Sequence, residues 1–376
     1  MILSRLYRLC RQAAFVLISL PLPVLAAANP IVIGQAIDLS GLNGSIGRDY
    51  VAGIKTYFDA LNAAGGIGGR RIRYIARDDR GMPQTTAKMT AELIERDQAE
   101  YLLGGIGDAA VQAVLADPVF QRSGLTLFAP LASTGARSAT SQVMFWRPGY
   151  QQEIRHIFSH FAKLGMKRIG VAYQPSPSNL DAYRGLSEEI RAHHMQLTAT
   201  MHLDTAPDGF RTDASRMAAS HPDFVLVIAD TIGTGLFLKE FRRHSAQTFV
   251  AGTSLINLAM LRELAGAQAV EWTVFSQVVP NPNASASPLQ AEHISTMKKY
   301  RDESVSSLTL EGFAAAKSLA KMIELARPSS RTALQEGRTQ KRMVDLGGLS
   351  IMAADGAPLS SYLDIALFRK GGGLVF

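Results

Sequence analysis

The sequence predicts an α/β protein with two doubly wound units, each built around a parallel sheet. Short β-branched runs alternate with amphipathic stretches along the chain, which is typical of βαβ units. The alternation begins at residue 31 and begins again near Arg147. The length of 376 residues exceeds one ordinary domain of roughly 150 residues and fits two.

The first unit opens with a strand over 31–37, which is apolar, β-branched and followed by a Ser-Gly pair. A helix is expected over 50–63, because Val51, Ile54 and Phe58 recur at helical spacing and a Gly-Gly pair follows. The other elements expected in this unit are strands over 71–79, 99–105 and 125–130 and helices over 85–96 and 109–122.

The second unit repeats the pattern. Its expected helices cover 153–164, 182–194, 210–219 and 233–244, and its expected strands cover 168–174, 196–203, 224–230, 248–254 and 272–279. A loop rich in Pro, Asn and Ser follows over 280–288, and two helices follow it over 289–300 and 310–326. From Gly347 the tail is expected to form two short strands, over 350–353 and 361–370, joined by a turn.

Residues 1–28 predict a secretory signal peptide. Three arginines precede the apolar run 13–25, and a small-residue AAAN site follows, with cleavage expected near 26–28. An uncleaved membrane anchor is the alternative, although the run is shorter than the ~20 apolar residues of a spanning helix. The single cysteine, Cys10, lies in this segment, so we expect no disulfide and no thiol chemistry in the mature chain. A bacterial periplasm fits this combination.

The composition and charge exclude several classes of protein. Hydrophobic residues make up 47% and charged residues 19%, as in a globular protein. The net charge is +7, of which the leader arginines contribute three, and the basic residues are scattered, so no nucleic-acid partner is expected. The sequence contains no G-x-S-x-G nucleophile elbow. We therefore expect no enzyme, no cofactor and no metal.

The motif GIGDAA (105–110) offers the best candidate for a binding loop. It follows a strand and opens a helix, as in dinucleotide-binding proteins, but no acidic residue ends the next strand. The free N–H groups at the helix start still suit a small polar ligand. Asp108 lies in this loop, and the hydroxyls of Ser133 and Thr134 lie in the next loop of the same kind.

Several motifs recur in the same order and spacing in a known family. They are DLSG (38–41), NAAGGIGGR (62–70), DDRGMPQTTA (78–87), LLGGIGD (102–108), FAPLAST (128–134), LGMKRIGVAYQ (164–174), FSQVVPNP (275–282), LEGFAAAKSLAKMIELA (310–326) and DLGGLSI (345–351). Together they resemble the leucine/isoleucine/valine-binding family of type I periplasmic solute-binding proteins.

The resemblance implies two Rossmann-like lobes joined by three hinge crossings, with a small ligand bound between them. It places residues 29–146 and 279–346 in the first lobe, and residues 147–278 and 347–376 in the second. It also implies a partner, the inner-membrane permease of an ABC importer. We expect a monomer.

Site residues carry over from the family only in part. Asp108 stands where relatives have a serine that holds the ligand carboxylate, and Ser133 matches a threonine. Thr253 stands where relatives have the acid that binds the ligand ammonium. Tyrosines of the relatives' second lobe fall near Ser178 and near Asp230. Tyr150, Tyr173 and Gln277 are further cleft candidates, and packing at a hinge or strand end is the alternative for the two tyrosines.

The sequence therefore predicts a periplasmic substrate-binding component of an ABC importer, and a ligand-sensing receptor of the same fold is the alternative. Two acids, Asp108 and Asp230, favour a ligand rich in hydrogen-bond donors, such as a polyol, an amide or an amine. They disfavour a simple branched-chain amino acid, whose carboxylate would lie near Asp108. Alternatively, Asp108 turns away and caps its own helix.

Overall fold

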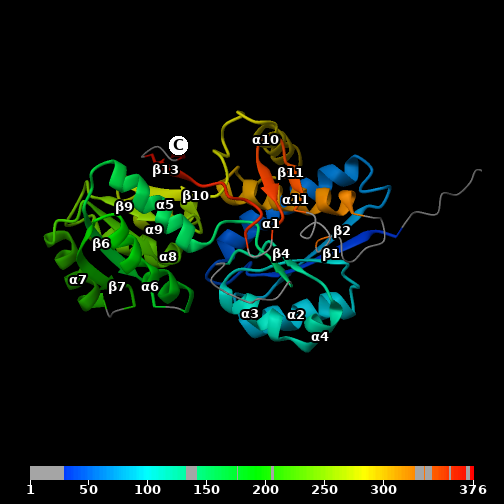
Figure 1. Cartoon of the computed structure of the whole chain (residues 1–376), viewed down its shortest axis with the longest axis horizontal. Coiled ribbons are helices and arrows are strands. Elements are labelled where there is room, and N and C mark those ends of the chain that lie inside the picture. The colour runs from blue at the N-terminus through cyan, green and yellow to red at the C-terminus, as the bar shows by residue number, and fades with distance from the viewer. Residues whose placement is uncertain are drawn as a thin grey trace, which may run out of the picture.

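Two α/β units lie side by side in the computed structural model of the chain (Figure 1). The structure describes residues 29–132, 142–175, 177–204, 207–326, 334, 341–354, 357–369 and 373–376. The expected leader and the candidates Ser133 and Thr134 lie outside these residues. Across the described chain, we find no helix that combines the length and the apolar character needed to span a bilayer.

The first unit contains most of the N-terminal elements and returns after the second. Its strands are β1 (Ile31–Ile37), β2 (Ile72–Asp78), β3 (Tyr101–Leu103), β4 (Leu127–Phe128), β5 (Val143–Met144), β11 (Met343–Asp345) and β12 (Ser350–Met352). Its helices are α1 (Gly44–Ala63), α2 (Pro83–Glu95), α3 (Asp108–Ala116), α4 (Pro118–Ser123), α10 (Pro288–Tyr300) and α11 (Ser307–Leu325).

The second unit takes the middle of the chain and its end. Its strands are β6 (Arg168–Tyr173), β7 (Gln196–His202), β8 (Phe224–Ile228), β9 (Phe249–Gly252), β10 (Thr273–Gln277), β13 (Asp364–Phe368) and β14 (Leu374–Val375). Its helices are α5 (Tyr150–Lys163), α6 (Pro177–Ala192), α7 (Pro207–Ala219), α8 (Thr231–Phe241) and α9 (Leu258–Ala265).

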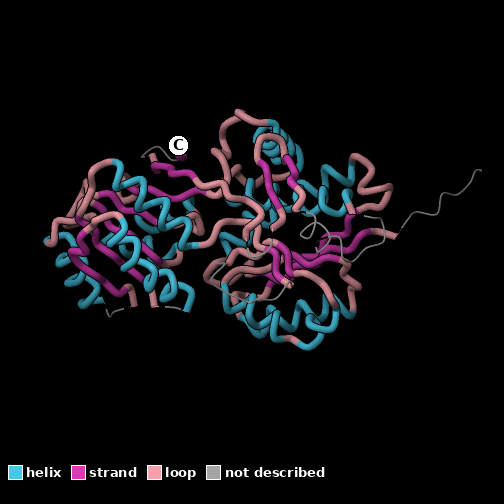
Figure 2. The backbone as a smooth tube through the Cα atoms, in the orientation of Figure 1, coloured by secondary structure: helices cyan, strands magenta, loops and turns pink. Residues whose placement is uncertain are grey.

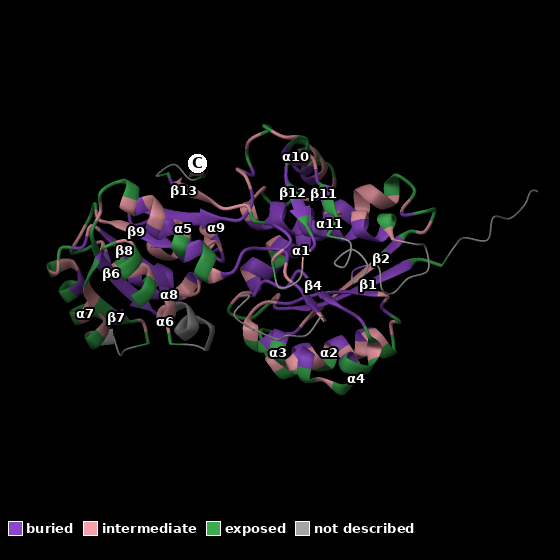
Figure 3. Cartoon of the chain, in the orientation of Figure 1, coloured by how far each residue is buried: buried purple, intermediate pink, exposed green. Residues whose placement is uncertain are grey.

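Each unit is a doubly wound sheet, as the sequence predicts. The first sheet has the order β2-β1-β3-β4-β5, and all its strands are parallel. The second has the order β14-β13-β10-β9-β8-β6-β7. At one edge of this sheet β13 runs antiparallel to β10, and β14 runs antiparallel to β13. Helices cover both faces, so β1 and β8 are buried along their whole length (Figure 3).

The helices α1 and α11 pack closely on one face of the first sheet. A Cβ on Gly53 would lie 1.9 Å from the Thr309 carbonyl oxygen, and one on Gly312 would lie 2.1 Å from the Tyr50 carbonyl oxygen. Only glycine allows this approach at both positions. The buried Phe313 and Leu319 of α11 join the same core.

The chain crosses between the units three times, which confirms the expected topology (Figure 2). It leaves the first sheet after β5, returns after β10 and leaves again after β12. The first and third crossings run side by side, because Leu359 and Ser360 donate backbone hydrogen bonds to the carbonyls of Phe145 and Trp146, at 2.9 and 2.8 Å.

Two details differ from the sequence expectation. The helix expected over 109–122 is two helices, because Asp117 ends α3, caps α4 by accepting from Val119 N at 2.8 Å and precedes Pro118. The tail strands do not pair with each other: β12 pairs with β11, and Ile351 lies in the core of the first unit. The chain therefore reaches the second sheet at β13 rather than at Gly347.

Candidate ligand-binding site

The strand order reverses once in each sheet, and candidate residues lie at both reversals. In the first sheet β1 lies between β2 and β3, and in the second β6 lies between β7 and β8. In open α/β sheets such switch points form the crevice that binds ligands, at the carboxyl ends of the strands. Asp108 follows β3, Tyr173 ends β6 and Asp230 follows β8.

The Asp108 carboxylate interacts electrostatically with the Tyr150 hydroxyl. Asp108 is the first helical residue of α3, after the N-cap Gly107, and Tyr150 is the first residue of α5 on the first crossing. Burial raises the pKa of the Tyr150 hydroxyl, Arg147 opposes this rise, and the Asp108 carboxylate adds to it. The Tyr150 ring packs against core residues of both units. This pair therefore marks a point where the two units meet.

Asp230 serves as a helix cap. Its Oδ1 accepts a hydrogen bond from Gly233 N at 2.7 Å at the start of α8, and its own N–H donates to Gln174 Oε1 at 3.2 Å. Asp230 is thus the N-cap residue of α8. The sequence also allowed Asp108 to cap its own helix, but the N-cap residue of α3 is Gly107. Asp230 is half-buried, and only its Oδ1 accepts a hydrogen bond from the described residues.

Tyr173 lies in an aromatic group of the second unit. Its hydroxyl lies 2.9 Å from His202 Nε2, and its ring stacks on Tyr183 with the centroids 4.3 Å apart. These contacts fit the packing alternative given for this residue. Thr253 directly follows β9 and is buried.

Gln277 is a buried connector at the second crossing. Its Nε2 donates to the Ser276 carbonyl at 2.8 Å, and its Oε1 accepts from Ser307 Oγ at 2.6 Å. Ser307 begins α11 of the first unit, so the side chain links the two units. Both ends of the amide already have partners.

A buried charge cluster, which sequence reasoning missed, occupies the crossing region. Arg147 Nη2 lies 3.2 Å from Glu153 Oε1, and Arg147 Nη1 lies 3.4 Å from Glu311 Oε1. All three side chains are at most 3% exposed. Glu153 Oε2 also accepts from Ser254 N at 2.8 Å and from Ser276 Oγ at 2.5 Å, and Arg147 donates to Ser254 Oγ. Glu311 belongs to the first unit and the serines to the second, so the cluster joins them.

The electrostatics of the cluster follow from its composition. One guanidinium faces two carboxylates, so full ionisation would leave a net negative charge in a dry interior. Burial raises the pKa of Glu311 to about 7, with Arg147 lowering it and Glu153 raising it further. Burial alone would lower the pKa of Arg147, but Glu311 and Glu153 raise it above its ordinary value. The sequence carries a sign that these charges are buried. Arg147 follows an apolar pair, and Glu153 lies on the apolar face of its helix.

No group of three or more His, Cys, Asp or Glu side chains that could hold a metal ion occurs among the described residues. The adjacent acids Asp78 and Asp79 accept hydrogen bonds from the loop after β1 and from α2. Asp78 Oδ1 accepts from Leu39 N at 2.9 Å, and Asp79 Oδ2 accepts from Thr86 Oγ1 at 2.7 Å. These carboxylates fix the loops beside the strand-end site.

Comparisons with known proteins agree with this architecture. The family model described as periplasmic binding protein matches residues 30–371. A substrate-binding periplasmic protein from Ralstonia solanacearum superposes with a TM-score of 0.83 and 28% identity, over 92% of this chain and 99% of that one. A branched-chain amino acid transporter substrate binding protein from Streptococcus pneumoniae, solved with isoleucine, gives a TM-score of 0.77 at 17% identity, over 92% of this chain and 99% of that one.

A curated relative matches a shorter stretch. An amino acid binding protein from Pseudomonas aeruginosa is 29% identical over 104 residues, which is 28% of this chain and 27% of that protein. The chain thus aligns with only about a quarter of this relative's length.

Proposed function

The chain belongs to the periplasmic binding protein family, and we propose that it is the substrate-binding component of an ABC importer that captures a small polar solute by closing two lobes around it. The main support for the proposal is that the strand order reverses once in each sheet. Asp108 lies at one reversal, Asp230 lies at the other, and Tyr150 lies between the units. One lobe holds the solute first, and the other closes over it by hinge motion.

The chain crossings define the lobes in this proposal. The first lobe comprises residues 29–146 and the returning segment that begins at 279, and the second comprises 147–278 and the C-terminal strands. The pairing of β12 with β11 supports placing the last border after Ser360 rather than after Leu346. The buried charge cluster then lies at the pivot, where a hinge moves least.

The solute-contacting residues in this proposal come from both lobes. They are Asp108, Ser133, Thr134, Tyr150, Tyr173, Asp230, Thr253 and Gln277. The bound state is selected by contacts that exist only when the lobes are closed. Capture by this route needs no covalent chemistry, and we propose that the protein is not an enzyme.

The solute class follows from the charges at the strand ends. A like-charge contact at ~4 Å costs about 1 kcal/mol in water and about 4 kcal/mol at a partly shielded site. A carboxylate beside Asp108 is therefore disfavoured, and an amine, an amide or a polyol is favoured. The Pseudomonas aeruginosa relative is named an amino acid binding protein, so an amino-acid-like solute whose carboxylate avoids Asp108 also fits.

Location and partner follow from the family. Periplasmic binding proteins work outside the inner membrane, so we propose the periplasm, reached through the signal peptide in residues 1–28. The partner is the permease of the importer, which receives the solute from the closed form. We propose that the protein acts as a monomer.

Mass spectrometry of small molecules released from denatured, freshly purified protein tests the proposal. We expect a small donor-rich solute in near-stoichiometric amount. A Thr253→Trp variant, which fills the strand-end site, should release none of it. Release of the same molecule from both proteins, or of none from either after growth in rich medium, would contradict the proposed site.

A further inference from the structure

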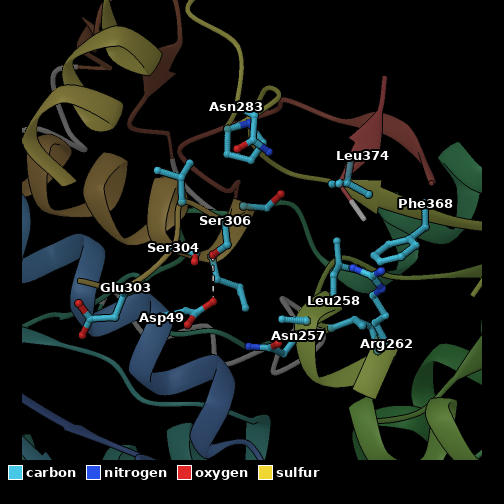
Figure 4. A pocket seen from close by; sticks show the side chains of 17 residues that line it. Asp49, Asn257, Leu258, Arg262, Asn283, Glu303, Ser304, Ser306, Phe368 and Leu374 are labelled. Atoms are coloured by element: carbon cyan, nitrogen blue, oxygen red, sulfur yellow. Dashed lines mark hydrogen bonds between the residues drawn. The ribbon is translucent and has the colours of Figure 1, made fainter. Parts of the chain in front are cut away.

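A second pocket lies between the two units, apart from the strand-end site. Its volume is about 430 Å³, within the range of small-molecule sites. It opens between the start of α1 and the segment before α11 on one side, and α9 and the β13–β14 hairpin on the other (Figure 4). None of the eight candidate solute-contacting residues lines it.

The two walls of the pocket carry opposite charges. Asp49 and Glu303 of the first unit lie on one wall, and Arg262 of the second unit lies on the other (Figure 4). Among the described residues, no Lys, Arg or His lies within ion-pair distance of either acid, and the Arg262 guanidinium has no carboxylate partner. The pocket therefore separates charges that could otherwise pair.

The surface between the charged walls is largely apolar. Leu258, Phe368 and Leu374 of the second unit lie on Arg262's side of the pocket. On the opposite wall, Asp49 Oδ2 accepts a hydrogen bond from Ser306 Oγ at 2.9 Å, which fixes its carboxylate. Burial raises the pKa of Asp49, the Ser306 hydrogen bond and Arg48 oppose the rise, and the nearby Glu303 adds to it. A cation at this wall would offset both effects.

The two walls are held together beside the pocket. Asn257 Nδ2, at the N-cap of α9, donates to the carbonyl of Ser45 in α1 at 3.4 Å, and Ser45 Oγ lies 3.3 Å from Met260 Sδ. The shape of the pocket therefore depends on how the two lobes are arranged. A ligand that spans both walls binds one arrangement better than others and shifts the lobe equilibrium toward it.

We propose that this pocket is a second binding site, for a small zwitterion whose ammonium and carboxylate stand at opposite ends of an apolar chain. The ammonium faces Asp49 and Glu303, the carboxylate faces Arg262, and the chain lies along Leu258 and Leu374. An α-amino acid holds both charges on one carbon and so reaches only one wall. The site shares no residue with the proposed solute site and goes beyond the proposed transport function.

Calorimetric titration of the purified protein with ε-aminocaproate tests this site. The matched probes are hexylamine and caproate, which each lack one charge, and leucine, which holds its charges together. We expect ε-aminocaproate to bind at least about tenfold more tightly than any of the three, because a charged hydrogen bond contributes roughly tenfold in affinity. Equal affinity for hexylamine or for caproate would contradict the two-walled site, as would the absence of ε-aminocaproate binding.

Three variants locate the binding. Asp49→Asn keeps the shape of its side chain, Arg262→Gln keeps a polar side chain, and each removes a charge, so each should weaken ε-aminocaproate binding about tenfold. Ser304→Trp adds a large ring at the pocket mouth and should abolish binding, with thermal unfolding confirming that each variant folds. The control Arg122→Gln, on the exposed surface of α4, should bind as the wild type does.

The outcome separates this site from the strand-end site. Thr253→Trp should keep ε-aminocaproate binding while it loses the solute found by mass spectrometry. If Thr253→Trp abolishes ε-aminocaproate binding, or if Asp49→Asn and Arg262→Gln bind it like the wild type, the second site is refuted and the transport proposal still stands.

Discussion

The crossing region and the proposed strand-end site treat polar groups in opposite ways. In the crossing region, Arg147, Glu153 and Glu311 are buried and joined across the lobes. At the strand ends, Asp230 and Tyr173 form hydrogen bonds with residues of the second lobe. Cross-lobe pairing suits a pivot that keeps its geometry, whereas partners within one lobe leave that lobe free to move.

Replacing Arg147 by methionine should have the largest effect on stability. It would leave two buried carboxylates without their cation, which costs about 3–5 kcal/mol in the free energy of unfolding. Urea denaturation measures the change. Arg77 is the matched control, because it also pairs with two acids, Glu92 and Asp97, but its side chain is 27% exposed. Arg77→Met should cost at most ~1 kcal/mol. Equal losses in the two variants would show that burial of the charge cluster does not set the cost.

Glu311 should make the crossing region sensitive to pH. Its pKa is raised from 4.5 to about 7, so the folded state holds the proton more tightly than the unfolded state does. Between these values the folded protein binds more protons, and the free energy of unfolding therefore falls as pH rises. The contribution is on the order of 3 kcal/mol.

The variant Glu311→Gln isolates this effect. Glutamine does not titrate, so the difference in unfolding free energy between wild type and variant should change across this pH window and level off on both sides. The measurement is a series of urea titrations from about pH 4 to about pH 8. A difference that stays constant with pH would show that folding does not raise the pKa of Glu311.

Removing the helix cap at the strand-end site should cost less. Asp230→Ala loses the acceptor for Gly233 N and should reduce the free energy of unfolding by about 1 kcal/mol. Asp230→Asn keeps an acceptor at the same place and should change it by only a few tenths. Thermal or urea unfolding distinguishes the two, and equal losses would mean that the charge, not the cap, matters.

Asp108→Asn should hardly change stability but should alter ligand preference. The change lies at a half-buried helix start, so we expect less than ~0.5 kcal/mol in unfolding. Removing the negative charge should let a carboxylate approach, gaining roughly 1 kcal/mol for leucine, isoleucine or valine. Calorimetry checks this, and micromolar binding of any of the three to the wild type would show that Asp108 does not repel the carboxylate.

The sequence predicted the fold well because periodicity reports burial. The β-branched runs at β1 and β8 are buried on both faces, and the restart near Arg147 coincides with the first crossing. The split between α3 and α4 could also have been read from the Asp-Pro pair at 117–118. The pairing of β12 with β11 could not, because short strands carry no signal of their partner.

The site was less accessible from the sequence. Strand-end positions made Asp108 and Asp230 candidates for ligand contact. A sequence does not show which partner a side chain bonds, and Asp230 caps its helix. The charge cluster joins residues 147, 153 and 311, which no local pattern connects. The second pocket needs residues from both lobes and the hairpin at the C-terminus, so only the folded chain brings it together.

The most direct test of the account is the distance between the two lobes with and without the released solute. From residue 29 onward the chain has no cysteine, so spin labels at Gln112→Cys on α3 and Glu188→Cys on α6 react at these positions alone. Both positions are exposed, and the two helices belong to different lobes that approach each other. Adding the solute identified by mass spectrometry should shorten the label distance by more than roughly 2 Å. An unchanged distance at saturating solute would contradict capture by lobe closure.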